Sequence, residues 1–545
     1  MTNVRTKRRI RMNSDKNNLP KIQGLSSVDF ISDTQGTEPP KYVFSFADRL
    51  FSLIAIALMI LMMRAIPIGE NPPGSAIVLL LLFTFGAVYL AIKGTKFKIR
   101  HYIFLGVSVI FCVAITTCAD GFIRSLTFLG LSAAFLAWIY DAGGLAGDRL
   151  RNDSLISHII KAVFINPFSN LGAMFKGVRG EGADELRSKN VLSALGLACL
   201  GLCIAVVPTV IVIVLLSYDS QFTDLLDDIF SFESGNLGDW ILDIILALPL
   251  SLLLFSAVYT VSSKMKQGEE KLLDLHRVST VPRSLLYAAV TPMLLIYVIF
   301  FISQWTYFVS AFSGVLPEGL TYAQYARNGF FDLCGVSFIN MLTLLFFCIF
   351  IKRKANGERG AASRVYTVII SVFSLVLVAI ALSKMILYIS YYGLTPSRVY
   401  SSWFIILLAL LFLVILIGQI VPRFPYASVG IIGAVTLFAF LAVPNVDSII
   451  ADYNVDRYLE GELSEIDVDT LDRLGLSSVP ARVRLEEELE GRSELSDYEK
   501  AALDAVRETL DDDAESISKA DDSFFSFSFA KSKAQRLLNE RAESR

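Results

Sequence analysis

Long apolar stretches separated by short polar ones run along the chain from residue 44 to residue 443. A helix needs about 20 mostly apolar residues to cross a bilayer, so each stretch is read as a membrane-spanning helix. The pattern predicts eleven spans, at residues 44–66, 75–93, 102–118, 122–140, 191–217, 240–262, 285–309, 328–351, 365–391, 399–421 and 424–443. Residues 102–118 and 122–140 are short and almost adjacent, so they form either two spans or a re-entrant hairpin.

The loop charges predict how these helices are oriented. Lys and Arg gather in alternate loops, as they do when cytoplasmic loops carry the positive charge. The intervening loops nearly lack them, and residues 218–239 contain six acidic residues with no Lys or Arg. The basic arm at residues 1–43 is therefore predicted to be disordered and cytoplasmic. After eleven crossings of the membrane, the C-terminus is predicted to lie outside the cytoplasm.

Between two predicted spans, residues 154–176 carry apolar side chains at helical spacing, interrupted at Asn166 and Pro167. The stretch is too polar to span a bilayer, and its pattern is typical of an interfacial helix pair on the cytoplasmic leaflet. The membrane-spanning region is thus predicted to cover residues 44–446, with membrane lipids as its first partners.

The C-terminal segment has a different character, because residues 447–545 carry twice as many acidic as basic residues. Short helical patterns end at Gly475 and Gly491, and Ser496 with Glu499 forms a capping box that opens another helix. The sequence predicts a small helical extracytoplasmic module at residues 447–510 and a flexible tail at 511–545. An acidic surface is repelled by nucleic acid, which is not expected as a partner.

Composition and motifs limit the chemistry. The chain is 54% hydrophobic and 19% charged, so most of its length is expected to lie within a bilayer. It contains no His-Glu-x-x-His, Gly-x-Ser-x-Gly or phosphate-binding loop. The three histidines are too scattered for a metal site, and the six cysteines are read as small core residues. No cofactor or metal is expected, and the pattern favours a protein without catalytic activity.

Ionisable residues inside membrane helices are expensive unless they are paired or hydrated. Five of them lie within about two turns of a predicted helix end: Arg64, Asp141, Asp243, Asp332 and Lys384. Their side chains can reach water from there, so an anchoring role is the first interpretation.

Two outer helix starts form the candidate site. Each follows a Gly-Leu-Thr sequence and carries an arginine, Arg327 in one case and Arg398 in the other. A cation in the first turn faces the positive end of the helix dipole, so an anionic group should offset it. The candidate outer site comprises Arg327, Asp332, Arg398, Thr321, Thr395 and Glu318.

Three runs carry a family resemblance: LPEGLTYAQYARNGFFDL at residues 316–333, YGLTPSRVY at 392–400 and DYNVDRY at 452–458, followed by Val479 and Pro480. In this order they resemble the bacterial membrane protein families known as domains of unknown function 4153 and 4173. The similarity covers about residues 190–490, and it implies a location in the bacterial envelope without implying a reaction.

These observations leave several functions open. The first is a non-enzymatic scaffold or sensor whose C-terminal module meets a protein partner in the envelope. The alternative is a transporter or lipid-handling protein, for which the outer arginines and Asp332 would line a hydrated cavity. A membrane transferase would need paired carboxylates facing the outer leaflet, such as Asp227, Asp228 and Asp243.

Overall fold

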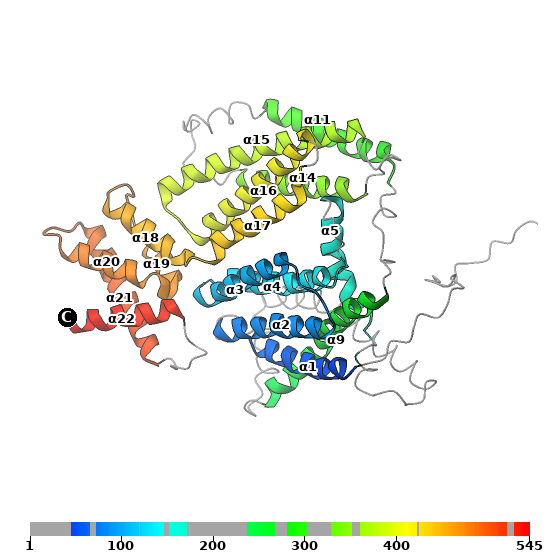
Figure 1. Cartoon of the computed structure of the whole chain (residues 1–545). Coiled ribbons are helices and arrows are strands. Elements are labelled where there is room, and N and C mark those ends of the chain that lie inside the picture. The colour runs from blue at the N-terminus through cyan, green and yellow to red at the C-terminus, as the bar shows by residue number, and fades with distance from the viewer. Residues whose placement is uncertain are drawn as a thin grey trace, which may run out of the picture. The chain divides into compact units, whose positions relative to one another are not determined.

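The computed structural model describes residues 45–65, 72–118, 120–145, 152–171, 174, 237–267, 281–303, 329–350, 360–421, 424–519 and 528–544. The elements within these ranges are all helices (Figure 1), so the predicted all-α class is confirmed. The predicted span at 191–217 lies outside the described residues, as do residues 1–43.

Within the described ranges, nine helices are long and apolar enough to cross a bilayer. They are α1 (Phe46–Ala65), α2 (Pro72–Ile92), α3 (Ile99–Thr117), α4 (Gly121–Ala142), α9 (Leu237–Gln267), α11 (Arg283–Ser303), α14 (Phe330–Phe350), α15 (Ala361–Tyr392) and α16 (Pro396–Ile420). A tenth arises if α17 (Tyr426–Ala442) and α18 (Val446–Leu459), which meet at a 64° bend, count as one broken span. Since α3 and α4 each have the length of a span, two crossings are favoured over a hairpin in this region.

The helices α1 to α4 pack with α9, and ion pairs lie near both ends of α1. Asp48 at the start of α1 is fully buried and binds Lys93, with 2.6 Å between Oδ1 and Nζ. Arg64 near the other end of α1 pairs with Asp243 of α9 at 3.1 Å. Two of the ionisable residues noted in the sequence therefore pair with each other, which offsets part of the cost of placing them in a membrane helix.

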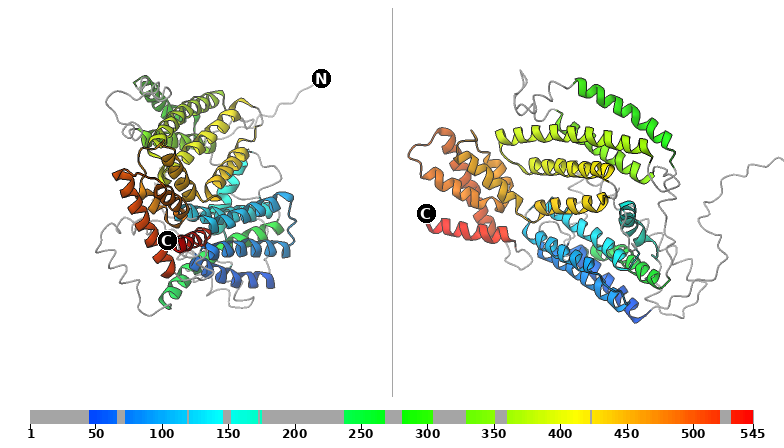
Figure 2. Two further views of the ribbon diagram at one scale, coloured as in Figure 1. Left: turned by 90° about the vertical axis from the view of Figure 1, so that its left-hand side faces the viewer. Right: turned by 45° about the horizontal axis from the view of Figure 1, so that its top comes forward.

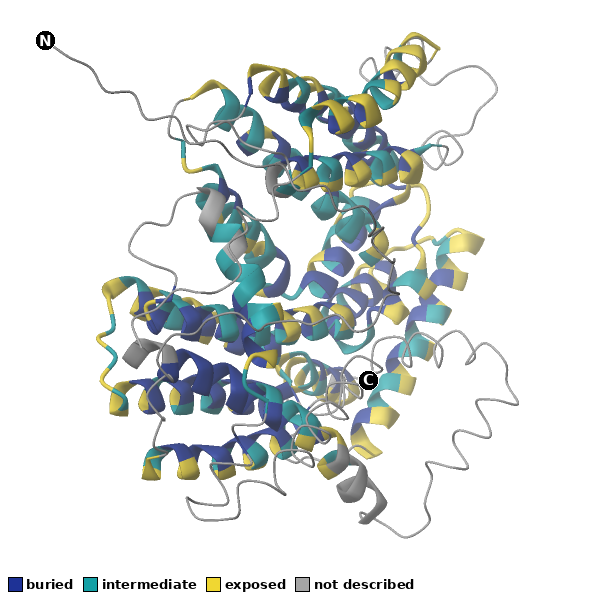
Figure 3. Cartoon of the chain, turned by 90° about the vertical axis from the view of Figure 1, so that its right-hand side faces the viewer, coloured by how far each residue is buried: buried dark blue, intermediate teal, exposed yellow. Residues whose placement is uncertain are grey.

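The helices α14, α15 and α16 pack side by side, with α11 against α15 (Figure 2). Their shared core is apolar and includes Leu344, Ile370, Leu377 and Phe412. Around these helices, buried positions alternate with exposed ones such as Ile299 and Phe331, which are large and apolar (Figure 3). Apolar side chains on the outside of long helices are suited to lipid contact.

A short segment that follows α4 packs on α9 and α17. It consists of α5 (Asn152–Ile160), which packs on α17, the π-helix η1 (Lys161–Ile165) and the 3-10 helix η2 (Asn166–Phe168), which packs on α9. Asn166 Nδ2 donates to the carbonyl of Ala257 at 3.0 Å, and Asn170 Nδ2 donates to Thr260 Oγ1 at 2.8 Å. The break expected at Asn166 and Pro167 is this 3-10 turn, while a position on the cytoplasmic leaflet stays a prediction.

The C-terminal segment continues through α18, α19 (Val468–Arg473), the 3-10 helix η3 (Gly475–Ser477), α20 (Val479–Glu490), α21 (Asp497–Lys519) and α22 (Phe529–Ser544). The capping box is present, because Glu499 accepts from the Ser496 backbone N–H at 2.7 Å and Ser496 Oγ accepts from the Glu499 N–H at 3.2 Å. The helix starts and stops expected before residue 510 are therefore found, whereas an independent outer module stays a prediction.

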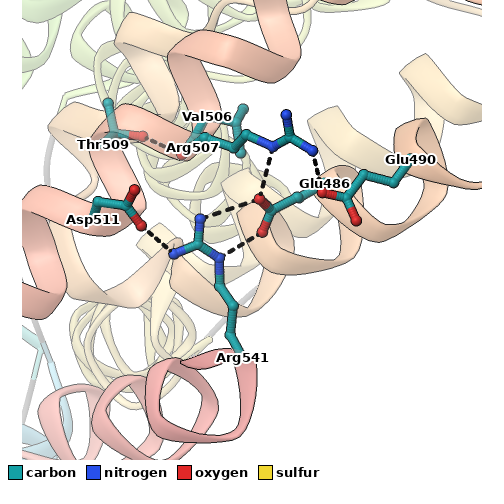
Figure 4. Close-up of polar contacts among 7 residues, drawn as sticks. All are labelled: Glu486, Glu490, Val506, Arg507, Thr509, Asp511 and Arg541. Atoms are coloured by element: carbon teal, nitrogen blue, oxygen red, sulfur yellow. Dashed lines mark hydrogen bonds and ion pairs between the residues drawn. The ribbon is translucent and has the colours of Figure 1, made fainter. Parts of the chain in front are cut away.

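The end of the chain differs from the flexible tail expected at 511–545, since α21 continues to Lys519 and α22 follows. Arginines distant in sequence pair with two of the three consecutive aspartates at residues 511–513. Arg482, fully buried on α20, pairs with Asp513, and Arg541 on α22 pairs with Asp511 at 2.6 Å. Arg541 also holds Glu486 in a two-pronged pair at 2.6 and 3.1 Å (Figure 4). The carboxylates of Asp511 and Asp513 thus gain partners that no local pattern supplies.

Candidate functional site at the α15–α16 turn

The turn from α15 to α16 is built by three residues of the YGLTPSRVY run. Gly393 has φ of +71°, a left-handed conformation that glycine adopts without strain, and it ends α15. The Thr395 side chain accepts from the Arg398 backbone N–H at 3.4 Å and so caps α16. Pro396 is the first residue of α16, where its missing N–H costs nothing. The predicted cap at Thr395 is therefore found.

Arg398 is held by the end of α15. Its Nη1 donates to the carbonyls of Tyr392 at 2.8 Å and Gly393 at 2.7 Å, and its guanidinium carbon lies 4.2 Å from the centre of the Tyr388 ring. The last carbonyls of a helix form the negative pole of its dipole, and the face of an aromatic ring attracts a cation. The group that offsets the arginine charge here is thus the C-terminus of α15.

This geometry makes Lys a poor substitute for Arg398. An ammonium group cannot stack on Tyr388 as a flat guanidinium does while bonding two carbonyls. We expect Arg398→Lys to lower the free energy of unfolding by about 2 kcal/mol, nearly as much as Arg398→Ala. The measurement is thermal unfolding of the purified protein in detergent.

Arg364→Lys is the matched control, because Arg364 lies in the first turn of α15 with an exposed side chain. It should leave stability unchanged. If Arg398→Lys behaves like the parent while Arg398→Ala unfolds earlier, Arg398 acts through its charge alone, as a membrane anchor would.

Asn454 joins the turn to α18. Its Oδ1 accepts from the Leu394 N–H at 2.7 Å, and its Nδ2 donates to the Leu394 carbonyl at 2.8 Å. The side chain is buried, and a Cβ on Gly393 would come within 2.5 Å of Asn454 Oδ1. Gly393 is therefore required both for its φ and for the space it leaves. One asparagine pairs with the backbone of Leu394 as a neighbouring β-strand would.

Arg457, one turn after Asn454, adds a second connection. Its Nη2 reaches the Ser390 carbonyl of α15 at 3.4 Å, and its Nη1 donates to Tyr453 OH at 2.9 Å. It also pairs with Glu462 at 3.0 Å. The runs at 392–400 and 452–458, more than fifty residues apart, therefore meet in one polar contact.

The structure brings together only part of the predicted outer site. Arg398 and Thr395 lie in the same turn, whereas Glu318, Thr321 and Arg327 lie outside the described residues. Asp332 is exposed in the first turn of α14, and no contact described here joins it to Arg398. Lys384 of α15 is buried, and its Nζ lies 3.9 Å from the position of a Cβ on Gly329, just before α14. The hydrated cavity expected for a transporter thus stays a prediction.

A second polar contact lies at mid-length of the spans. Tyr297 OH of α11 donates to Asn340 Oδ1 of α14 at 2.6 Å, and Asn340 Nδ2 donates to Ser374 Oγ of α15 at 2.9 Å. Asn340 and Ser374 are fully buried. Hydrogen bonds of this kind hold membrane helices together where no water competes. Among the described residues, no group of three His, Cys, Asp or Glu side chains could hold a metal ion.

A family profile described as Domain of unknown function (DUF4153) matches residues 102–485. The chain belongs to the DUF4153 family. The first of the two resemblances noted in the sequence is therefore confirmed, while the profile match gives no support to the second, domain 4173. None of the curated proteins and none of the solved structures matches the chain.

The DUF4153 match begins earlier than the three runs indicated, near the start of α3 rather than near residue 190. It includes the α15–α16 turn with Arg398, and α18 with Asn454 and Arg457. It leaves out α1, α2, α21 and α22. The contact between the two runs thus lies wholly within the family region.

Asn166, Asn340 and Asn454 each make a long-range contact that the sequence pattern did not predict. Asn340 lies at the centre of its span but is not ionisable. Asn454 belongs to the DYNVDRY run, where no local pattern indicates its role. An asparagine inside an apolar helical pattern is the signal that would have identified Asn340.

Proposed function

We propose that this DUF4153 protein is a scaffold or sensor of the bacterial cell membrane, and that it presents residues 446–544 to a protein partner in the envelope. The observation that carries the proposal is the pair of hydrogen bonds between Asn454 and Leu394. They fix α18 to the α15–α16 turn, so α18 is held as an extension of the spans. A segment that is held in this way can present a surface of fixed position to a protein partner.

The packing of the C-terminal helices supports this proposal. Glu486, Arg541 and Arg482 are all buried and paired, and they link α20 to both α21 and α22. Tyr498 of α21 exchanges two further bonds with the backbone of Ile466, at 2.7 and 2.8 Å. Buried charges that are paired favour one arrangement, because any other arrangement would leave them without partners.

The location proposed for this segment rests on the loop charges. A cytoplasmic N-terminus and eleven crossings put residues 446–544 outside the cytoplasm. The acidic character of the segment agrees with this side, since the anionic lipid of the cytoplasmic leaflet would repel it.

A second candidate is a transporter or lipid-handling protein, favoured by the contact of Tyr297, Asn340 and Ser374. Polar side chains at the middle of a span often mark a path for a substrate. In this structure the three side chains bond to one another, and Ser374 Oγ also donates to the Ile370 carbonyl at 2.7 Å. A transporter would have to open this contact to water.

Single cysteines test both candidates in one experiment. We would replace Ser14, Ser493 or Ser374 in a protein without native cysteines and treat intact cells with a membrane-impermeant thiol reagent. Only Ser493→Cys should react, because residue 493 is exposed on the proposed outer side and Ser374 is buried. Lysed cells supply the control, in which Ser14→Cys should react as well.

If Ser493→Cys fails to react in intact cells but reacts after lysis, the proposal of an outer C-terminal segment is wrong. Labelling at both 14 and 493 in intact cells would instead make the number of crossings even and place the N-terminus outside. Rapid labelling of Ser374→Cys would instead favour the transporter.

A further inference from the structure

Two connections far apart in sequence meet where the first spans contact the last ones. Thr117 Oγ1, at the end of α3, donates to the carbonyl of Val443 at 3.3 Å. Val443 lies in the connection between α17 and α18. Nearby, the rings of Phe111 and Phe438 stack at 5.8 Å, and those of Phe122 and Tyr400 lie 6.2 Å apart. The α3–α4 connection, α16 and the start of α18 therefore surround one small region.

Asp447 lies in this region without a hydrogen-bond donor. It belongs to the first turn of α18, whose cap is the neighbouring Asn445, and its side chain is 7% exposed. Among the described residues, none forms a hydrogen bond or an ion pair with this carboxyl group. Burial of a carboxylate without such partners strongly disfavours its charged form.

The groups around Asp447 add to this effect. Asp120 and Cys118 face it from the α3–α4 connection, and Tyr400 faces it from α16. Asp120 also caps α4, accepting from the Ile123 N–H at 2.8 Å. Arg124 of α4 donates from its Nη2 to the Cys118 carbonyl at 3.0 Å, and its charge acts on Asp120. A second carboxylate, and no cation, thus acts directly on Asp447.

We propose that Asp447 is a proton-binding site that controls the contact between the α3–α4 connection and the α17–α18 turn. A proton taken from the medium by the carboxylate removes the repulsion from Asp120 and allows close packing. Loss of this proton places a negative charge on the buried Asp447 beside that of Asp120 and loosens the contact. The proposal goes beyond the proposed function and does not depend on it, because it needs only the packing of these two connections.

The direction of the pH dependence follows from the pKa. Burial, and then the charge of Asp120, raise the pKa of Asp447 from 3.8 to about 6. Between these values the folded protein holds a proton that the unfolded chain releases. The contribution to stability is therefore greatest at the acidic end of this window and is lost as the pH rises through 6.

Asp447→Asn in the full-length protein tests this directly. The amide is uncharged at every pH, so the variant should melt a few degrees above the parent at pH 7.5, about half as far above it at pH 5, and close to it at pH 4. Asp469→Asn is the matched control, because Asp469 occupies the first turn of α19 but is exposed. It should leave the pH dependence of the parent unchanged.

A second readout reports on the contact itself. Cys118 is 5% exposed there, and in a protein that keeps only this cysteine its labelling at pH 7.5 should be several-fold slower with Asp447→Asn than without it. If Asp447→Asn does not fold, Asp120→Asn gives the answer, since asparagine caps a helix as well as aspartate does and should produce the same changes. Equal melting and equal labelling in the parent and the variants would overturn the proposal.

Discussion

Replacing Asn454 by Ala is expected to detach α18 from the spans and to lower the free energy of unfolding by about 3 kcal/mol. Both the N–H and the carbonyl of Leu394 lose their partner, and each buried backbone group left without one costs about 1 to 3 kcal/mol. The effect should be largest near the α15–α16 turn. Hydrogen exchange of the Leu394 amide, together with thermal unfolding in detergent, measures it.

Asn454→Asp separates hydrogen bonding from packing. The carboxylate can still accept from the Leu394 N–H, but it would face the Leu394 carbonyl without a proton to donate. It should therefore destabilise the protein about as much as Ala. Asn539→Ala on the exposed face of α22 serves as the control. If Asn454→Ala melts like the parent, the two runs are in contact without stabilising one another, and the proposed presentation of α18 loses its support.

Replacing Arg541 by Met is expected to release α22, at a cost of about 3 kcal/mol. Arg541 and Glu486 are 8% and 4% exposed, and removing one partner of a buried ion pair leaves the other charge without compensation. Arg507 remains within 3.4 Å of Glu486, which keeps the expected cost at the lower end for such pairs. Asp511 is largely exposed, so its part is small.

Limited proteolysis is the measurement, because a released α22 should be cleaved while the spans stay intact. Arg536→Met is the control, since Arg536 lies on the same helix with an exposed side chain whose pairing with Glu540 is worth little. Equal protection of α22 in the Arg541 variant and the parent would show that apolar contacts such as Leu538 hold this helix without the ion pair.

The membrane helices could be predicted because a long apolar run has few alternatives to a span. Caps such as Thr395 and Ser496 could be predicted too, since each involves residues only three positions apart. The acidic run at 511–513 could not, because its pairing depends on Arg482 and Arg541, about thirty residues away on either side. The sequence predicted a flexible tail from residue 511, whereas the structure has a helix there that the tertiary ion pairs stabilise.

In the candidate site, too, contacts between residues close in sequence could be predicted and contacts between distant residues could not. The sequence predicts Arg398 to be a cation that needs an anionic group to offset it. Its actual partners are backbone carbonyls five and six residues earlier, at a helix end that the sequence had already indicated. Asn454 could not be assigned in this way, because its partner is sixty residues away and belongs to the backbone, which no residue type reveals.

The burial of Arg541 in the last turn of α22 matters for anyone who wishes to purify or image this protein. A fluorescent domain or affinity tag fused directly to Arg545 would begin within about one helical turn of a side chain that must stay enclosed between α20 and α21. A flexible Gly/Ser linker of a dozen or more residues would let such a fusion stand clear. A tag on the basic N-terminal arm avoids α22 altogether.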